Sequence, residues 1–319
     1  MSTESIKLNT GARIPILGLG TWQSAPGEVK NAVAYALQTG YKHIDCAFCY
    51  ANEDEVGEGL QEAFEKGIKR EDVFVTTKLW STFSSKVEEG LDLSLKSLGL
   101  EYVDLYLAST TSGVSGFGHL MQWTGNDIRF PKKPDGSRDL DLSWSHTQTW
   151  KQMEDLLKIG KARAIGVCNY SVRYLNELLQ ESTIVPAVNQ IENHPHLPQN
   201  DIVHYCKEKG IHVTAYSPLG STGSPLARDP CVQALAAKYQ VSPSTVLLSY
   251  HSARGISVLA KSVTPGRIDQ NQLLIPLGEE DLQMLEAIHK TSGVTRYVYP
   301  PFGVDFGFPD KAQDLKNSR

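Results

Sequence analysis

Three polar residues in the N-terminal third of the chain, Asp45, Tyr50 and Lys78, could together move a proton. A phenol has a pKa of about 10, and it becomes a useful proton donor or acceptor when a neighbouring cation favours its phenolate. Lys78 could supply that charge, and Asp45 could hold Lys78 in place and keep it protonated. The set predicts acid–base chemistry at Tyr50, although each residue alone also fits a polar position at the rim of a fold.

A second group of polar residues lies in "LAKSVTPGRIDQN", residues 259–271. Lys261, Ser262 and Arg267 come close to the start of a short helical pattern, and Asn271 follows one helical turn later. Basic side chains and backbone N–H groups at such a place bind phosphate monoesters. The segment therefore predicts a phosphate site, with a solvated basic turn as the alternative.

These residues follow short apolar runs that alternate with amphipathic stretches of helical period. Parallel strands buried on both faces are nearly continuous in apolar residues, and eight strand–helix units in one chain are typical of a (β/α)8 TIM barrel, whose chemistry lies at the carboxyl ends of the strands. We therefore expect one domain spanning residues 1–319. The expected strands are 16–20, 43–47, 73–79, 103–107, 162–167, 187–190, 212–217 and 257–262.

Three further segments refine this prediction. A doubly wound sheet is the alternative fold, but "GLGTWQ" after the first strand lacks the third glycine of a dinucleotide fingerprint. "IKLNTGARIPI" predicts an N-terminal hairpin, and Gly40 and Gly99 are expected to end helices. The aromatic tail after about residue 292 shows neither the helical nor the strand period of apolar residues, which predicts a long loop. Such a loop can form one wall of a substrate pocket.

The composition favours a small-molecule ligand and a cytoplasmic location. The formal net charge is −5 and the basic residues form no run, which argues against nucleic acid or an anionic membrane as partner. No apolar run reaches the roughly 18 residues of a membrane span, and no secretory pattern opens the chain. Five cysteines suit a reducing compartment. Cys46 and Cys49 form a C-x-x-C without a second ligand pair, so we expect packed thiols and no metal site.

Taken together, the motifs resemble the aldo-keto reductase superfamily, and most of all its fungal glycerol-dehydrogenase and aldehyde-reductase members. The resemblance extends from "LNTGARIPILGLGTWQ" through "GYKHIDCAFCYANEDEVGEGL" and "KIGKARAIGVCNYS" to "VLAKSVTPGRIDQN". It implies a barrel that binds NADPH in an extended form without a Rossmann motif and reduces a small carbonyl compound. We expect a monomer, although the sequence leaves the oligomeric state open.

The resemblance also implies a role for each matching position. Tyr50 would be the general acid, with Lys78 and Asp45 as its supports. Asn169 and Gln190 would hold the nicotinamide carboxamide, and the residues from Lys261 onward would bind the adenosine 2′-phosphate. The full set implied for the cofactor is Thr21, Trp22, Asp45, Asn169, Gln190, Tyr216, Ser217, Leu219, Lys261, Ser262, Val263, Thr264, Arg267 and Asn271.

The sequence departs from the family pattern after the fourth strand, where members commonly have Leu-x-His-Trp-Pro. Here "LYL" is followed by Ala-Ser-Thr, and the divergence is confined to about residues 108–129. An ungapped alignment puts Ser109 in the place of the histidine, whereas an insertion puts Gln122 there. We do not expect His119 or His146 to replace it. Smaller departures are Cys168, where Ser is usual, and Cys46, where Thr is common.

Several hypotheses follow from this departure. The first is a working NADPH-dependent aldehyde or ketone reductase, with Ser109 or Gln122 as a weaker hydrogen-bond donor. The second is a reductase of activated carbon–carbon double bonds, which ranks lower because neither residue is acidic. The third is an NADPH-binding protein with impaired or lost reductase activity, motivated by the glycine-rich "TTSGVSGFG". Residues 108–129 could also reflect a gene-model artefact.

Overall fold

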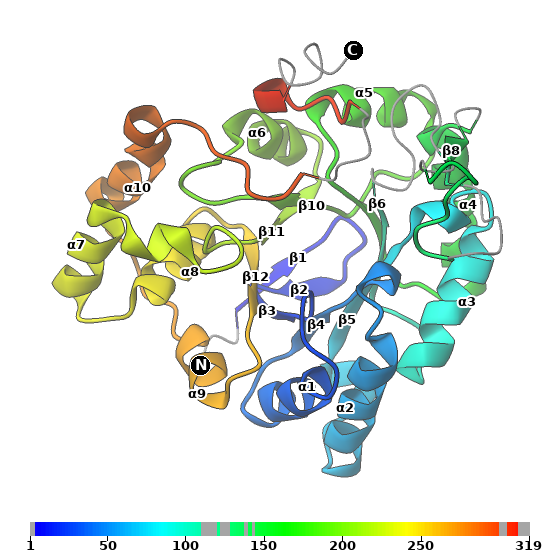
Figure 1. Ribbon diagram of the computed structural model, residues 1–319, viewed down its shortest axis with the longest axis horizontal. Helices are drawn as coiled ribbons and strands as arrows, with labels where there is room; N and C mark the ends of the chain where they lie inside the picture. Colours follow the sequence, from blue (N-terminus) through cyan, green and yellow to red (C-terminus); the bar gives the residue numbers. More distant parts are fainter. Residues whose placement is uncertain are drawn as a thin grey trace.

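The computed structural model describes residues 4–109, 120–121, 128–136, 140–141, 144–299 and 305–311. At its centre eight parallel strands form a closed barrel, which confirms the predicted fold (Figure 1). Each strand pairs with the next along the chain, and the last pairs with the first. The strands are β3 (Leu17–Gly20), β4 (His43–Asp45), β5 (Phe74–Leu79), β6 (Leu105–Ser109), β9 (Ile165–Cys168), β10 (Val188–Glu192), β11 (His212–Tyr216) and β12 (Ser257–Lys261).

The predicted strand positions are close to those observed, because both faces of each strand are covered. All six residues of β5 are buried, as are all five of β10. The interior is packed tightly: a Cβ on Gly18 of β3 would come within 2.7 Å of both His43 and Leu259. The barrel is therefore a filled core rather than a channel, which leaves its rim for function.

An outer ring of helices covers the barrel, with two helices, α7 and α8, between β11 and β12 (Figure 1). Gly99 has φ of 65° after α3 and Gly40 has φ of 112° after α1, so the left-handed helix ends predicted at these glycines are confirmed. The helices are α1 (Val29–Gln38), α2 (Glu53–Glu65), α3 (Val87–Leu98), α4 (His146–Ile159), α5 (Val172–Glu181), α6 (Asn200–Glu208), α7 (Pro230–Tyr239), α8 (Pro243–Ala253), α9 (Pro265–Asn271) and α10 (Glu279–Ser292).

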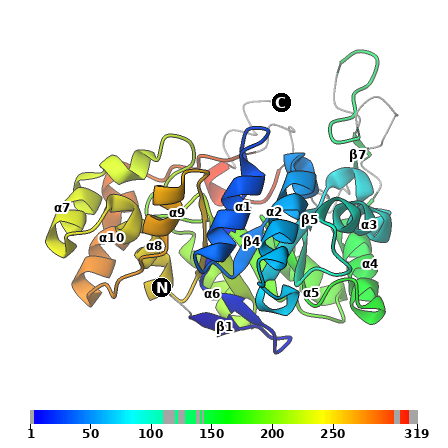
Figure 2. The same cartoon turned by 90° about the horizontal axis from the view of Figure 1, so that it is seen from below.

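The predicted N-terminal hairpin is formed by β1 (Ser5–Lys7) and β2 (Arg13–Pro15). It lies at one end of the barrel (Figure 2), where Leu8 and Ile14 pack with apolar residues at the amino ends of the strands. A short ribbon of β7 (Leu120–Met121) and β8 (Leu140–Asp141) lies toward the opposite end. The hairpin thus closes one end, and ligand access is left to the carboxyl ends of the strands.

The described part of the C-terminal tail forms loops and one 3-10 turn, Pro309–Lys311, as the lack of a period predicted. Phe306 and Phe308 are buried, so this tail packs against the barrel. Within the described residues, no helix is long and apolar enough to cross a membrane.

Candidate active site

Asp45, Tyr50 and Lys78 meet at the carboxyl ends of β4 and β5. The Lys78 Nζ lies 2.6 Å from Asp45 Oδ1 and donates to the Tyr50 hydroxyl at 3.3 Å. A third hydrogen bond, of 2.9 Å, runs from Nζ to the carbonyl oxygen of Cys46. The 3-10 turn Phe48–Tyr50 and the left-handed Ala51, with φ of 58°, turn the chain so that Tyr50 comes back over Lys78. The predicted acid–base set is therefore assembled in one place.

Asp45 connects this set to the far side of the barrel. Its second oxygen, Oδ2, accepts a 2.7 Å hydrogen bond from Gln190 Nε2 on β10. Its main-chain oxygen accepts from both the N–H and the hydroxyl of Thr21. A buried carboxylate with partners on several strands is fixed in position, and it keeps the ammonium of Lys78 fixed with it.

Burial and charge have opposite effects on the two proton-carrying groups. Burial is the largest single effect on Lys78 and disfavours its charged form, but the charge and hydrogen bond of Asp45, together with smaller contributions from neighbouring groups, hold the pKa of Lys78 above its usual range. Burial raises the pKa of Tyr50, and the charge of Lys78 only partly opposes this. Tyr50 is therefore a protonated phenol at neutral pH, ready to act as an acid.

Asn169 and Tyr216 lie at the carboxyl ends of β9 and β11, on either side of β10, and the Tyr216 hydroxyl donates to Asn169 Oδ1 at 2.8 Å. Asn169 and Ser217, the residues after β9 and β11, have φ of 63° and 50°. Positive φ is uncommon in residues other than glycine, and for serine it has a conformational cost. The chain turns sharply at both strand ends, which places Asn169, Tyr216 and Ser217 on the wall of one cavity.

Lys261 ends β12, and Ser262, Val263 and Thr264 follow it before α9. The Ser262 hydroxyl accepts from the N–H of Thr264 at 3.1 Å, forming a tight turn. Lys261 Nζ donates to the carbonyl oxygen of Gln23 at 3.2 Å, and Arg267 is exposed on α9. Two cations and two hydroxyls gathered on one short turn form a donor set suited to a phosphate group.

A single cavity of about 490 Å³ joins the acid–base set to this donor set. An extended dinucleotide that carries a phosphate monoester fits the residues present, because Tyr50 and Lys78 line one end and Lys261 and Arg267 the other. Asn271 does not line the cavity; it is buried in α9, one turn beyond Arg267. The predicted residues on the cavity wall are Thr21, Trp22, Asp45, Tyr50, Lys78, Asn169, Gln190, Tyr216, Ser217, Leu219, Lys261, Ser262, Val263, Thr264 and Arg267.

A second, outer cavity of about 610 Å³ shares Trp22 and Cys49 with the first. Residues that sequence reasoning did not single out line it. Trp80 and Phe130 contact each other edge to face, with ring centroids 5.5 Å apart. The C-terminal tail contributes Tyr297, Val298 and Tyr299, as its aromatic composition suggested, and the rest of the wall is formed by Gln23, Gly220, Ser221 and Thr222.

Ser109, the last residue of β6, lines the inner cavity beside Cys168. The alternative residue Gln122 and His119 both lie outside the described residues. His146 is buried on α4 against Tyr170 and Tyr174, away from the cavity. His43 lies within β4, where it contacts Thr76 Oγ1 at 2.9 Å. Of the two alternatives, Ser109 is thus the one among the described residues, and it lies on the wall of the inner cavity.

All five cysteines lie among the described residues and are thiols rather than disulfides. Burial raises the pKa of Cys49 to about 12 and that of Cys46 well above its usual range. A neutral thiol is a weak nucleophile, which agrees with the interpretation of "CAFC" as packed thiols.

Comparisons with known proteins agree with this geometry. The family model described as "Aldo/keto reductase family" matches residues 16–290. The chain is 57% identical to a D-galacturonate reductase of Hypocrea jecorina, over 98% of this chain and 100% of that protein. It is 45% identical to glycerol 2-dehydrogenase (NADP(+)) of Saccharomyces cerevisiae, over 95% of this chain and 97% of that protein.

Two solved structures have the same fold. An aldose reductase of Schistosoma japonicum has a TM-score of 0.82 at 38% identity, covering 94% of this chain and 99% of that one. A Bombyx mori aldo-keto reductase in complex with NADP has a TM-score of 0.80 at 35% identity, covering 95% and 99%. The barrel and its proton-donor site define an oxidoreductase. The chain belongs to the aldo/keto reductase family.

Proposed function

We propose that this enzyme reduces the carbonyl group of an aldehyde or ketone to an alcohol with NADPH, and that Tyr50 is its general acid. The single observation that carries the proposal is the cavity that joins the Tyr50–Lys78–Asp45 set to the basic turn at Lys261 and Arg267. Several relatives are named as reductases or NADP(+)-linked dehydrogenases, which supports the same function.

The roles of the residues follow from their contacts. NADPH, when bound, supplies the hydride that the carbonyl carbon accepts. Tyr50 donates its hydroxyl proton to the carbonyl oxygen, and the Lys78 ammonium stabilises the resulting phenolate across the 3.3 Å hydrogen bond. Asp45 keeps Lys78 charged. Gln190 links this ion pair to the wall that would hold the nicotinamide, which Asn169, Tyr216, Thr21 and Trp22 complete.

The proposal also covers the setting in which the enzyme works. Residues 1–319 would form one domain, active as a monomer in the cytoplasm on a small carbonyl substrate. No disulfide is needed to hold the fold, since all five cysteines are free thiols and three of them are buried.

The test is NADPH oxidation by the purified chain against a panel of aldehydes, ketones and enones, followed by identification of the product. Turnover with an aldehyde or ketone supports the proposal. Tight NADPH binding without turnover overturns it, and reduction of an enone only at the carbon–carbon double bond assigns the site to the second activity.

Arg267→Ala is expected to raise the Kd for NADPH by about tenfold or more, because a charge-assisted hydrogen bond to the 2′-phosphate is lost. The Kd for NADH should not change. Both constants can be measured by fluorescence titration. The matched control is Arg228→Ala, since Arg228 is also exposed but does not line the cavity. An equal rise in the Kd for NADPH and for NADH would show that Arg267 does not bind the 2′-phosphate.

Ser109→Ala is expected to lower kcat by about 10²-fold, the order of effect seen when one polarising donor is removed. Ser109 is proposed to donate to the substrate oxygen, which places it in the role of the absent histidine. Gln122→Ala is the paired variant. A silent Ser109→Ala beside an impaired Gln122→Ala would transfer that role to Gln122.

A further inference from the structure

Glu192, the last residue of β10, has a carboxylate with no solvent exposure. A charged side chain is almost never fully buried unless it is paired. Its neighbour in the barrel rim, Tyr216, belongs to the inner cavity, but Glu192 does not line that cavity. The proton-transfer scheme above gives Glu192 no role, so its burial needs another explanation.

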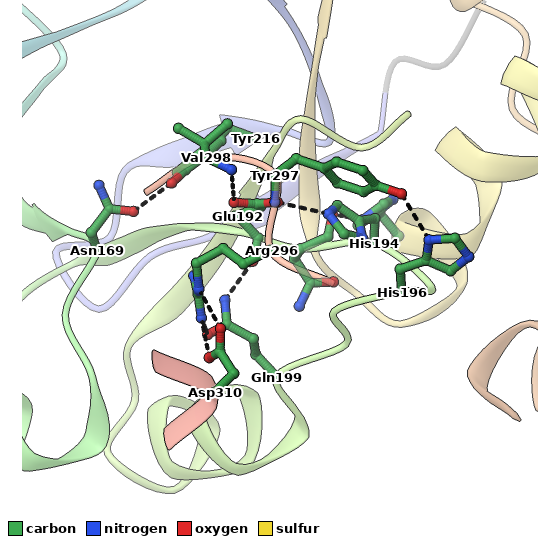
Figure 3. Close-up of polar contacts among 12 residues, drawn as sticks. Asn169, Glu192, His194, His196, Gln199, Tyr216, Arg296, Tyr297, Val298 and Asp310 are labelled. Carbon is green, nitrogen blue, oxygen red and sulfur yellow. Dashed lines mark hydrogen bonds and ion pairs between the residues drawn. The ribbon is translucent and has the colours of Figure 1, made fainter. Parts of the chain in front are cut away.

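The partners of Glu192 come mainly from the C-terminal tail (Figure 3). The backbone N–H of Tyr297 donates to Oε1 at 2.6 Å, and that of Val298 donates to Oε2 at 2.9 Å. His194 Nε2 also lies 2.9 Å from Oε1. Two consecutive N–H groups that converge on one carboxylate fix the backbone of residues 297 and 298 against the barrel.

Arg296 forms a second anchor immediately before this point. Its guanidinium donates to both carboxylate oxygens of Asp310, at 2.9 Å and 2.8 Å, and to Gln199 Oε1 at 2.8 Å. Gln199 in turn donates to the main-chain oxygen of Glu192. The two anchors therefore attach the tail to the last residue of β10 and to the segment that follows it (Figure 3).

The anchored residues are wall residues of the cavities. Val298 lines the inner cavity together with Tyr50, and Tyr297 and Val298 line the outer cavity together with Trp80. A shift of the backbone at residue 298 would move this wall relative to Tyr50. Glu192 itself lines neither cavity, so it acts on a substrate through the residues that it contacts, and its hydrogen bonds to the tail are the ones that reach the wall residues Tyr297 and Val298.

We infer that Glu192 is a positioning residue that sets the width of the substrate pocket by holding the backbone of Tyr297 and Val298. The inference rests on the proposed function, because the pocket is taken to receive the carbonyl substrate. The carboxylate of Glu192 thereby determines how strongly the enzyme discriminates between small and bulky aldehydes.

Glu192→Gln tests this inference with almost no change in size. An amide has one acceptor oxygen, so one of the two tail N–H groups faces an NH₂ donor instead. Amide hydrogen exchange at Tyr297 and Val298 should become about tenfold faster or more, because a charge-assisted hydrogen bond is lost. The ratio of kcat/KM for a bulky aromatic aldehyde to that for glyceraldehyde should change by about tenfold through KM, which is within the range of pocket contacts. The Kd for NADPH should stay constant.

The matched control is Glu154→Gln on α4. Glu154 is also buried and also accepts two consecutive backbone N–H groups, from Thr183 and Ile184, both at 2.8 Å. It lines neither cavity. This variant should lose a similar amount of stability and leave the substrate ratio unchanged.

A double-mutant cycle with Val298→Ala tests whether Glu192 affects substrate selectivity through the side chain of Val298. If Glu192 acts through Val298, adding Glu192→Gln to Val298→Ala should change the ratio much less than it does in the parent enzyme. Asp310→Asn weakens the contact of Asp310 with Arg296. It should shift the amide exchange at Tyr297 and Val298 and the ratio of kcat/KM values in the same direction as Glu192→Gln. This second variant provides the test if Glu192→Gln does not fold.

The possible results are distinct. Unchanged exchange at Tyr297 and Val298 in Glu192→Gln, or an equal change of ratio in Glu154→Gln, would overturn the inference. Absence of NADPH oxidation in the parent enzyme would instead overturn the proposed function, and the exchange measurement would still show whether Glu192 holds the tail.

Discussion

Tyr50→Phe is expected to lower kcat by about 10² to 10⁴-fold, the usual worth of a positioned general acid. The substitution removes only the hydroxyl that Lys78 contacts, and the ring keeps its place beside Trp22, whose centroid lies 6.4 Å away. The Kd for NADPH should therefore change little. Steady-state kinetics and fluorescence titration measure the two quantities separately.

Tyr35→Phe is the matched control for this prediction. The Tyr35 hydroxyl also donates to a charged residue, Asp269 at 2.7 Å, but Tyr35 lies on α1 outside the cavity. Its loss should leave kcat unchanged. Full activity in Tyr50→Phe would remove Tyr50 from the role of general acid, and with it the proton-transfer scheme.

Asp45→Asn is expected to destabilise the fold by about 3–5 kcal/mol, the cost of breaking a buried ion pair by removing one partner. Asp45 and Lys78 are both buried and lie 2.6 Å apart, so the ammonium would be left without its counter-charge. Urea unfolding measures this loss. Asp281→Asn is the control: its partner Lys238 is 58% exposed and remains hydrated, so a much smaller loss is expected.

The same variant should change how stability depends on pH. In the parent enzyme the pKa of Lys78 is raised above its unfolded value, so this stabilisation is fully present below about pH 10.4 and is lost only as the pH rises through the folded pKa. In Asp45→Asn, burial without a counter-charge lowers the pKa of Lys78. The deficit in stability should then shrink as the pH is raised from 7 to about 9, because Lys78 can lose its proton. A deficit independent of pH would contradict this.

The barrel could be predicted from the sequence because each strand is a short run of buried residues, and that pattern depends on neighbours along the chain. Asp45, Tyr50 and Lys78 could be found for a related reason. Asp45 and Lys78 lie at the carboxyl ends of β4 and β5 and Tyr50 closely follows β4, and parallel strands bring their carboxyl ends together at one rim. The helix ends at Gly40 and Gly99 could also be predicted locally, because glycine readily adopts the positive φ that these positions have.

What the sequence could not predict depends on residues that are distant along the chain. The contact of Glu192 with the N–H groups of Tyr297 and Val298 involves backbone atoms, which leave no pattern in the side chains. The direction in which the fold shifts the pKa of Tyr50 could not be predicted either. The charge of Lys78 could be anticipated, but burial, which outweighs it, is a property of the folded rim. Asn271, placed by helical spacing one turn beyond Arg267, is buried on α9 and is not among the residues that line the cavity, so its role in binding the cofactor stays a prediction.

The pairing of β12 with β3 joins the two ends of the chain and has a consequence for synthesis and folding. Until β12 has left the ribosome, β3 and β11 are open strand edges, which favour pairing with other chains. Such distant pairing also slows folding. Thr21 and Trp22 lie on one side of this seam and Lys261 and Arg267 on the other. A ligand bound across it at 100 times its Kd would add about 2.7 kcal/mol to the closed state. A nascent chain would thus gain its last barrel strand and the basic turn of its ligand site in the same step.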